Sequence, residues 1–368
     1  MHVVVCGGGA IGCSIAYFLA RRGVKATVVE STGVACAASG KSGGFLARDW
    51  CAGTPLDPLA RRSFDLHAEL AAEIADDWGY RRLDTYGGFA SRRMSRGQSR
   101  SVHALDWFAP DVAVSQALGS PETTAQVHPA RYTEAMMRAA QAHGAELRQA
   151  RISGLARGDD RVTGVECGGA EAVEADAVVI AMGPWSVLAA RWLPLPPVFG
   201  LKGHSLVFDT GDRVPAEAAF LEYQEESGAV LTPELFPRPD GTTYVCGISG
   251  EEVVPLDPAR VAPDNGAIYR LEAMCRTLSP VLAAAPIVAR QACYRPVTGD
   301  GLPLIGRVPG VAGAYVATGH SVWGILNAPA TGEAMAELIA DGAARTVDLA
   351  PFDPGRLRPL DPARLRVS

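Results

Sequence analysis

The first thirty residues hold the feature that most restricts the possible fold: two short apolar strands separated by a glycine turn and a helix. Residues 2–6 form a β-branched run, and residues 26–30 form a second apolar strand. Between them, residues 10–22 carry apolar side chains at the spacing of one helix face. This order predicts a βαβ unit at the start of an α/β nucleotide-binding domain.

The turn of this unit reads GGGAIG, which is the pattern G-x-G-x-x-G. Gly7 permits the tight turn, Gly9 lets a pyrophosphate approach the backbone, and Gly12 lets the helix pack on the strand. The helix then begins at Ala10 and Ile11, where free N–H groups and the helix dipole favour an anion. We therefore predict a dinucleotide at this turn; the alternative is a glycine-rich turn that holds no ligand.

Glu30 ends the second strand, 18 residues after Gly12, where its carboxylate can accept hydrogen bonds from ribose hydroxyls. A carboxylate at this position disfavours a 2′-phosphate, and therefore NADP. Residues 39–42 (Ser-Gly-Lys-Ser) resemble the end of a P-loop, but Ala35 stands where its first glycine should be and a loop precedes it. The sequence therefore predicts one dinucleotide fingerprint and no P-loop.

The composition excludes several other classes of protein. The 34 basic and 40 acidic residues give a net charge of −6, which does not suggest a nucleic-acid or anionic-membrane surface. The eight cysteines are scattered without a C-x-x-C pair, so we expect neither a metal site nor a disulfide scaffold. No apolar run reaches 18 residues, and the N-terminus lacks the basic start of a signal peptide. We expect a soluble, cytoplasmic protein with no membrane or nucleic-acid partner.

Strand and helix patterns alternate in blocks along the rest of the chain. Helical patterns cover residues 56–79, 129–143, 264–279 and 325–340, and strand patterns cover residues 145–155, 161–167, 177–181, 198–250 and 314–317. The β-rich blocks fall between βα segments, which predicts one nucleotide domain interrupted twice by a second domain. The expected limits are 1–82, 128–198 and 291–368 for the first domain, and 83–127 and 199–290 for the second.

Four separated stretches resemble one known family. They are residues 3–30, residues 36–50 with the motif S-G-K-x-G-G-F-L-A, residues 178–186, and residues 292–340. In this order they resemble the superfamily of FAD-dependent D-amino acid, glycine and sarcosine oxidases, in a branch of poorly defined function. The resemblance implies an α/β fold with a glutathione-reductase-type FAD-binding Rossmann domain and an inserted antiparallel-sheet (α+β) substrate domain.

The resemblance also implies where FAD is held. The segment from Ser39 to Leu46 is expected to run past the pyrophosphate and the flavin ring, and the segment from Gly319 leads into a helix whose N-terminus faces the flavin. The cysteine that bonds covalently to flavin in sarcosine oxidases matches Cys293, but we expect a free buried cysteine and non-covalent FAD. The expected cofactor residues are Gly7, Gly9, Ala10, Ile11, Gly12, Glu30, Ser31, Ser39, Gly40, Lys41, Ser42, Gly43, Gly44, Phe45, Leu46, Ile152, Ala181, Gly183, Trp185, Gly319, His320, Trp323, Gly324, Ile325 and Leu326.

Three residues are candidates for the substrate chemistry. Arg295 matches the arginine that clamps the substrate carboxylate in D-amino acid and glycine oxidases, with two parallel hydrogen bonds; the alternative is a structural arginine. Thr232 and Glu234, on one face of a strand over 230–236, stand where glycine oxidases place a histidine and a tyrosine. Glu234 could hold a substrate ammonium there; the alternative is a solvated glutamate at the rim. Lys202 matches a family strand and could assist oxygen activation near the flavin.

Two departures separate the chain from the named oxidases. Val322 replaces a second arginine of glycine oxidases, and Leu326 replaces the carboxylate-binding lysine of sarcosine oxidases. We therefore do not expect glycine or sarcosine to be the substrate.

The resemblance implies an oxidoreductase that oxidises the C–N bond of an amine or amino acid by hydride transfer to flavin N5. The product is an imine, and O2 is reduced to H2O2. The expected partners are a small amine or amino acid and O2, and the expected assembly is a monomer or small homo-oligomer. Three alternatives remain: a dehydrogenase with another acceptor, a flavin-binding protein with a structural, redox-sensing or trafficking role, and a pyridine-nucleotide dehydrogenase.

Overall fold

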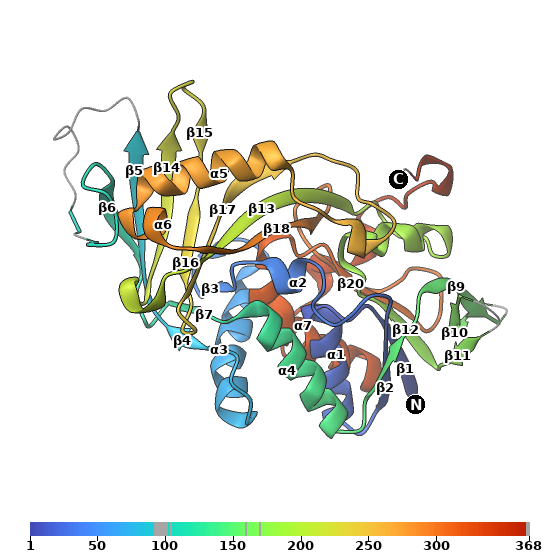
Figure 1. The fold of residues 1–368 in the computed structure, drawn as a ribbon. Coiled ribbons are helices and arrows are strands. Elements are labelled where there is room, and N and C mark those ends of the chain that lie inside the picture. Colours follow the sequence, from blue (N-terminus) through green and yellow to red (C-terminus); the bar gives the residue numbers. More distant parts are fainter. Residues whose placement is uncertain (92–101, 104, 159, 169–170, 366–368) are drawn as a thin grey trace.

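The computed structural model describes residues 1–91, 102–103, 105–158, 160–168 and 171–365. They form two large sheets, each with helices against it (Figure 1). The six-stranded sheet is built from three separated parts of the chain, and the eight-stranded sheet is built from the two parts between them.

The six-stranded sheet begins with the predicted βαβ unit. Its strands are parallel except for β19, which runs antiparallel to β20. In spatial order they are β19 (Leu304–Arg307), β20 (Ala314–Thr318), β12 (Ala177–Ile180), β1 (His2–Cys6), β2 (Lys25–Glu30) and β8 (Glu146–Gln149).

Both faces of this sheet are covered, which explains the uninterrupted apolar run of β1. Val3 and Val5 belong to the cluster formed with the helices, whereas Val4 and Cys6 pack with a three-stranded sheet on the other face. The strand pattern over residues 145–155 divides between β8 of the large sheet and β9 of this small one. The helices are α1 (Ala10–Arg21), α3 (Asp57–Glu73), α4 (Pro129–Ala142) and α7 (Gly324–Ala340), and the small sheet contains β9 (Ile152–Arg157), β10 (Val162–Cys167) and β11 (Ala172–Glu174).

The eight-stranded sheet is antiparallel apart from the parallel pair of β14 and β5. In spatial order its strands are β18 (Ile287–Val297), β13 (Phe199–Asp209), β17 (Thr242–Gly250), β16 (Glu234–Pro237), β14 (Glu217–Gln224), β5 (Asp84–Ser91) and β6 (Ala113–Gly119), with β15 (Val230–Leu231) beside β14. One face packs against α5 (Asn265–Leu278) and α6 (Pro280–Ala284). A short sheet of β3 (Phe45–Ala47), β7 (Thr124–Gln126) and β4 (Arg81–Arg82) completes the fold.

The expected domain limits remain a prediction. The two sheets use the expected stretches of chain in the expected order, but β18 runs across the expected boundary at residue 291.

Two further predicted elements differ from the structure. The helix predicted over 56–79 ends at Glu73, where Ile74 adopts an extended backbone, and Trp78 beyond it is buried in the core. The strand predicted over 230–236 is two strands, since Pro233 lacks the N–H that a continuous ladder would need. The helices predicted over 129–143, 264–279 and 325–340 are confirmed as α4, α5 and α7.

Candidate active site

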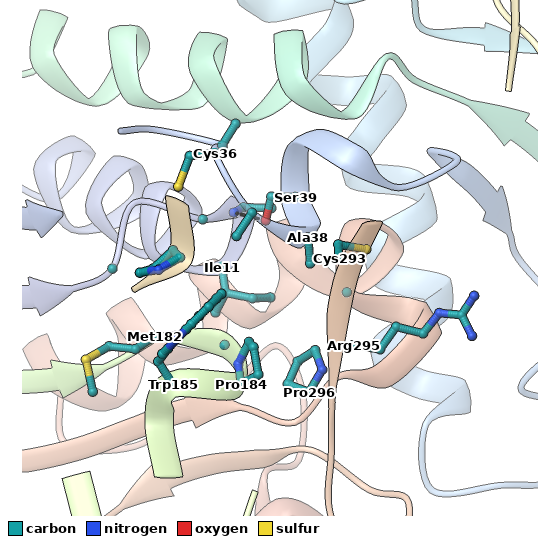
Figure 2. A pocket seen from close by; sticks show the side chains of 18 of the residues that line it. Ile11, Cys36, Ala38, Ser39, Met182, Pro184, Trp185, Cys293, Arg295 and Pro296 are labelled. Carbon is teal, nitrogen blue, oxygen red and sulfur yellow. Dashed lines mark hydrogen bonds between the residues drawn. The ribbon is translucent and has the colours of Figure 1, made fainter. Parts of the chain in front are cut away.

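One elongated pocket lies between the two large sheets. It runs from the glycine turn after β1 to the face of β18, so that Cys36 and Arg295 lie toward opposite ends (Figure 2). The carboxyl ends of β1, β2 and β12 open into it, which is where open α/β sheets bind ligands. The predicted residues that line it are Gly7, Gly9, Ala10, Ile11, Glu30, Ser31, Ser39, Ser42, Gly43, Ile152, Ala181, Gly183, Trp185, Glu234, Cys293, Arg295, His320, Gly324 and Ile325.

The glycine turn shows the close backbone approaches that its sequence implies. Gly7 has a φ of +112°, and a Cβ on it would lie 2.5 Å from the carbonyl oxygen of Ala181. A Cβ on Gly12 would lie 2.0 Å from the carbonyl oxygen of Gly7. Side chains at these two positions would therefore force β1, β12 and α1 apart. Gly9 instead faces the pocket, where a Cβ would meet only the Ser39 hydroxyl, at 3.1 Å.

Two polar side chains complete this turn. The N–H of Ala10 donates to Ser39 Oγ at 2.9 Å. The Glu30 carboxylate accepts from the N–H of Gly8 at 2.7 Å and from the N–H of Thr32 at 2.8 Å. The acid at the end of β2 is therefore held in place by backbone donors, beside the turn where the sequence predicts the dinucleotide.

The N-terminal end of α7 also faces the pocket, through Gly324 and Ile325. Pro329 interrupts the hydrogen bonding of this helix, because proline has no N–H and its ring displaces the carbonyl one turn earlier. The carbonyl oxygens of Ile325 and Leu326 accept instead from His67 Nε2, at 3.0 and 3.2 Å.

The donor and the acceptor that complete the hydrogen bonding of α7 both come from α3. The N–H of Ala330, beyond the interruption, donates to Ser63 Oγ at 3.0 Å. His67 must carry its proton on Nε2, because both partners of that nitrogen are carbonyl oxygens. Burial lowers the pKa of His67 to about 4, so the ring is neutral near pH 7. Two residues of α3, one turn apart, thus hold the start of α7 against the pocket.

At the far end, β18 presents Cys293 and Arg295 to the pocket (Figure 2). Cys293 lies opposite Gly203 of β13, and a Cβ on Gly203 would lie 3.4 Å from Arg295 Nη2. The bare backbone at Gly203 leaves room for the guanidinium, which donates to Ser249 Oγ at 3.5 Å. Burial raises the pKa of the Cys293 thiol, which disfavours the thiolate that covalent attachment would use.

Glu234 lies on β16, opposite Cys246 of β17, and lines the same pocket. The Cys246 thiol donates to its Oε2 at 3.5 Å. Burial raises the pKa of Glu234, and this effect outweighs the charge of Arg295 and the hydrogen bond from Cys246, which lower it. The structure therefore places a desolvated acid and a guanidinium in one pocket.

The structure does not bring every predicted residue to this pocket. Lys202 lies one residue from Gly203 on β13, and its ammonium forms an ion pair with Glu252 instead. Thr232 is exposed between β15 and β16 and does not share the pocket with Glu234. The other predicted residues that do not line it are Gly12, Gly40, Lys41, Gly44, Phe45, Leu46, Gly319, Trp323 and Leu326.

Sequence reasoning missed pocket residues of two kinds. Cys36 and Met182 lie inside stretches that the sequence had singled out, so a wider reading of those stretches would have included them. Gly203, Tyr244 and Cys246 come from neighbouring strands of the eight-stranded sheet. No sequence signal marks them, because only strand pairing brings them together.

One orphaned polar group fits a bound cofactor. The Ser42 hydroxyl lines the pocket, is buried, and has no hydrogen-bond partner among the described residues. A polar atom of a dinucleotide can supply this partner. In the same part of the chain, no group of three or more His, Cys, Asp or Glu side chains could hold a metal ion. None of the helices described is long and apolar enough to cross a membrane.

A Rossmann-type sheet, a glycine cradle and a second sheet that closes the pocket define a dinucleotide-binding protein. The family model described as FAD dependent oxidoreductase matches residues 2–338. The chain belongs to this family, and it binds FAD.

Individual relatives agree with this assignment. The chain is 30% identical to the Schizosaccharomyces pombe protein C1F5.03c, named as an oxidoreductase, over 96% of this chain and 97% of that protein. It is 32% identical to glycine oxidase of Bacillus licheniformis, over 93% of this chain and 94% of that enzyme. The solved structure of glycine oxidase from Geobacillus kaustophilus superposes with a TM-score of 0.79 at 25% identity, covering 96% of this chain and 97% of that one.

Proposed function

We propose that this chain oxidises the C–N bond of an amino acid, with O2 as electron acceptor and H2O2 as a product. The observation that carries the proposal is the arrangement of Arg295 and Glu234, a cation and an acid that face one cofactor pocket from different strands. An amino acid offers the complementary pair, a carboxylate and an amine.

Arg295 would hold the carboxylate. Among the described residues its side chain has one hydrogen bond, to Ser249 Oγ at 3.5 Å, so most of its donors remain for a ligand. A guanidinium binds a carboxylate through two parallel hydrogen bonds and so fixes the orientation of the adjacent carbon. This is the pre-organisation that transfer of a hydride to a fixed acceptor requires.

Glu234 would hold the nitrogen. In its carboxylate form it can accept hydrogen bonds from a substrate ammonium, and the positive charge would lower the pKa that burial raises. The carbon between the two groups would then lie in a fixed position. The nitrogen would give up one proton to the Glu234 carboxylate or to water, and bound FAD would supply the acceptor for the hydride from this carbon. Water hydrolyses the imine product.

Two relatives suggest small amino acids as the class of substrate, since one is named glycine oxidase and the solved structure carries the same name. Val322, where glycine oxidases have a second arginine, lines the pocket and leaves Arg295 as the carboxylate partner there. We therefore propose an amino acid other than glycine. FAD would be held without a bond to Cys293.

The test is anaerobic reduction of the flavin by rapid mixing, with an amino acid and its matched decarboxylated amine. Arg295→Ala should slow reduction by the amino acid at least tenfold while FAD stays bound, since a lost charge-assisted bond costs about 1.5–3 kcal/mol. Arg290→Ala is the matched control, because Arg290 lies on the same strand but pairs with Glu272 outside the pocket.

Equal reduction by the two compounds, unchanged in Arg295→Ala, would show that no carboxylate is recognised. Flavin that stays oxidised with every amine and amino acid would favour the structural or redox-sensing alternative. Reduced flavin that persists in air but is consumed by an artificial electron acceptor would favour a dehydrogenase.

A further inference from the structure

Residues 251–258, here called the strap, connect β17 to α5 and pass over the cofactor pocket. Leu256 and Pro258 line the pocket. Val253, on the same short segment, is 56% exposed to solvent. The strap is therefore a single layer of chain between the pocket and the solvent. In Figure 1 this connection leaves the eight-stranded sheet and reaches toward the six-stranded sheet before it returns to α5.

The eight-stranded sheet holds the strap at two points. The ammonium of Lys202, on β13, forms an ion pair with Glu252. The hydroxyl of Tyr294, on β18, donates to the carbonyl oxygen of Val253 at 3.1 Å. Lys202 and Tyr294 are direct partners in the register of the two strands. Neither residue lines the pocket, so both act on the strap from outside it.

The third attachment comes from the other side of the pocket. Trp185 follows β12 of the six-stranded sheet and lines the pocket (Figure 2), and its indole N–H donates to the carbonyl oxygen of Pro255 at 2.7 Å. The strap is thus tied to both large sheets, with its pocket-facing residues Leu256 and Pro258 next to the Trp185 attachment.

A glycine makes room for the strap on the sheet. A Cβ on Gly200 would lie 2.2 Å from Cγ2 of Val254, so this valine packs directly on the bare backbone of β13. Apolar packing by Val254 and three polar attachments therefore hold the strap. Residues 251–257 of the strap belong to no strand or helix.

We propose that the strap retains FAD in its pocket, and that Lys202, Tyr294 and Trp185 are positioning residues that keep it closed. A strap that covers part of the pocket slows the release of a ligand held beneath it, so weaker attachments raise the rate of release. This gives Lys202 a place in cofactor retention and not in oxygen activation. The proposal concerns the cofactor and not the substrate, so it can fail or hold independently of the proposed reaction.

The experiment measures the rate at which FAD leaves the purified holoprotein on dilution, by the rise in free flavin fluorescence. Lys202→Met and Tyr294→Phe each remove one attachment with little change of shape, and Trp185→Phe removes the third attachment together with part of the indole ring. Each should raise the release rate about three- to tenfold, the range expected for one hydrogen bond. Lys25→Met is the matched control, because Lys25 pairs with Glu146 on the exposed edge of the other sheet. It should leave the rate unchanged.

The decision rests on Lys202→Met and Tyr294→Phe, since Trp185 itself lines the pocket. An unchanged release rate in either of these two variants would overturn the proposal. If one of them fails to fold, Gly200→Ala replaces it, because the added methyl would displace Val254 and crowd the ring of Tyr294, and neither residue lines the pocket. A Lys202→Met protein that releases FAD normally but reoxidises slowly in air would return Lys202 to oxygen activation.

Discussion

At the scale of single residues, the immediate neighbours of Arg295 and Glu234 decide where these two side chains lie and how they are charged. Arg295 can lie across β13 because position 203 carries no side chain. Glu234 has a raised pKa because burial removes water from its carboxylate. The same two side chains on an exposed surface would be an ordinary solvated pair, so their local surroundings are what would suit them to bind the proposed zwitterionic substrate.

Glu234→Gln tests the acid directly. The amide oxygen of glutamine can still accept from an ammonium but carries no negative charge, so the dissociation constant of the amino acid should rise by about tenfold or more. In the unchanged protein, binding should weaken as pH falls through the Glu234 pKa, because the protonated carboxyl no longer carries a charge. Since burial raises this pKa, the loss should occur at a higher pH than for an exposed glutamate.

The measurement is a titration of the flavin spectrum with a carboxylate-bearing amine under anaerobic conditions, across pH 4.5–8. Glu222→Gln is the control, because Glu222 is exposed on the neighbouring β14. A Glu234→Gln protein with wild-type affinity and the same pH profile would remove Glu234 from the substrate site.

At the scale of elements, α3 and α7 form one unit around a proline. Pro329 leaves α7 with carbonyl groups that the helix itself cannot satisfy, and α3 supplies the missing donor and acceptor from His67 and Ser63. The N-terminus of α7 lines the pocket, so the position of α3 decides where that helix end lies. A break in one helix is thus stable only because another helix packs against it.

His67→Phe should destabilise the protein by about 1–3 kcal/mol, because it leaves buried carbonyl groups without a donor. His67 also makes stability depend on pH. Its folded pKa is about 4 against 6.5 for a free histidine, so the unfolded chain takes up a proton first as the pH falls. This contribution is complete above pH 6.5, is lost between pH 6.5 and 4, and amounts to roughly 3 kcal/mol.

Urea unfolding at pH 7 and pH 5 measures both effects. His67→Gln keeps an N–H donor but cannot take up a proton, so it should lose less stability between the two pH values than the unchanged protein. His143→Gln serves as the control, since His143 is exposed at the end of α4. An identical pH dependence in His67→Gln would contradict a buried neutral ring at this position.

At the scale of the whole molecule, the pocket belongs to neither sheet alone. Gly9 and Glu30 come from the six-stranded sheet, and Arg295 and Glu234 come from the eight-stranded one. A cofactor in this pocket contacts both, so its binding free energy should add to the stability of the assembled fold.

FAD in hundredfold excess over its dissociation constant should stabilise the apoprotein by about 2.7 kcal/mol, seen as a rise in the unfolding midpoint. Gly9→Val should abolish this rise and yield colourless protein, because the side chain would project from the turn that faces the pocket. Gly299→Val, where a Cβ meets nothing within 4 Å, should still respond to FAD. If Gly9→Val purifies with FAD bound, the fingerprint does not hold the dinucleotide.

The sequence by itself determined the βαβ unit, most helices and the family, because these depend on local patterns. The spacing along the sequence identifies Gly7, Gly9, Gly12 and Glu30 directly. The structure places Gly7, Gly9 and Glu30 at the pocket. Helix periodicity gave correct positions for α4, α5 and α7, although α3 ends at Glu73, before the predicted end at residue 79.

Only the tertiary structure decided which strand residues share a face. Lys202 and Gly203 are adjacent in sequence, yet Gly203 lines the pocket and Lys202 pairs with Glu252. Successive residues of a strand face opposite sides of the sheet. Glu234 meets Cys246 through strand pairing between residues that no local pattern connects. Local chemistry could therefore be predicted from spacing, whereas the pairing of distant strands, on which the proposed substrate site depends, could not.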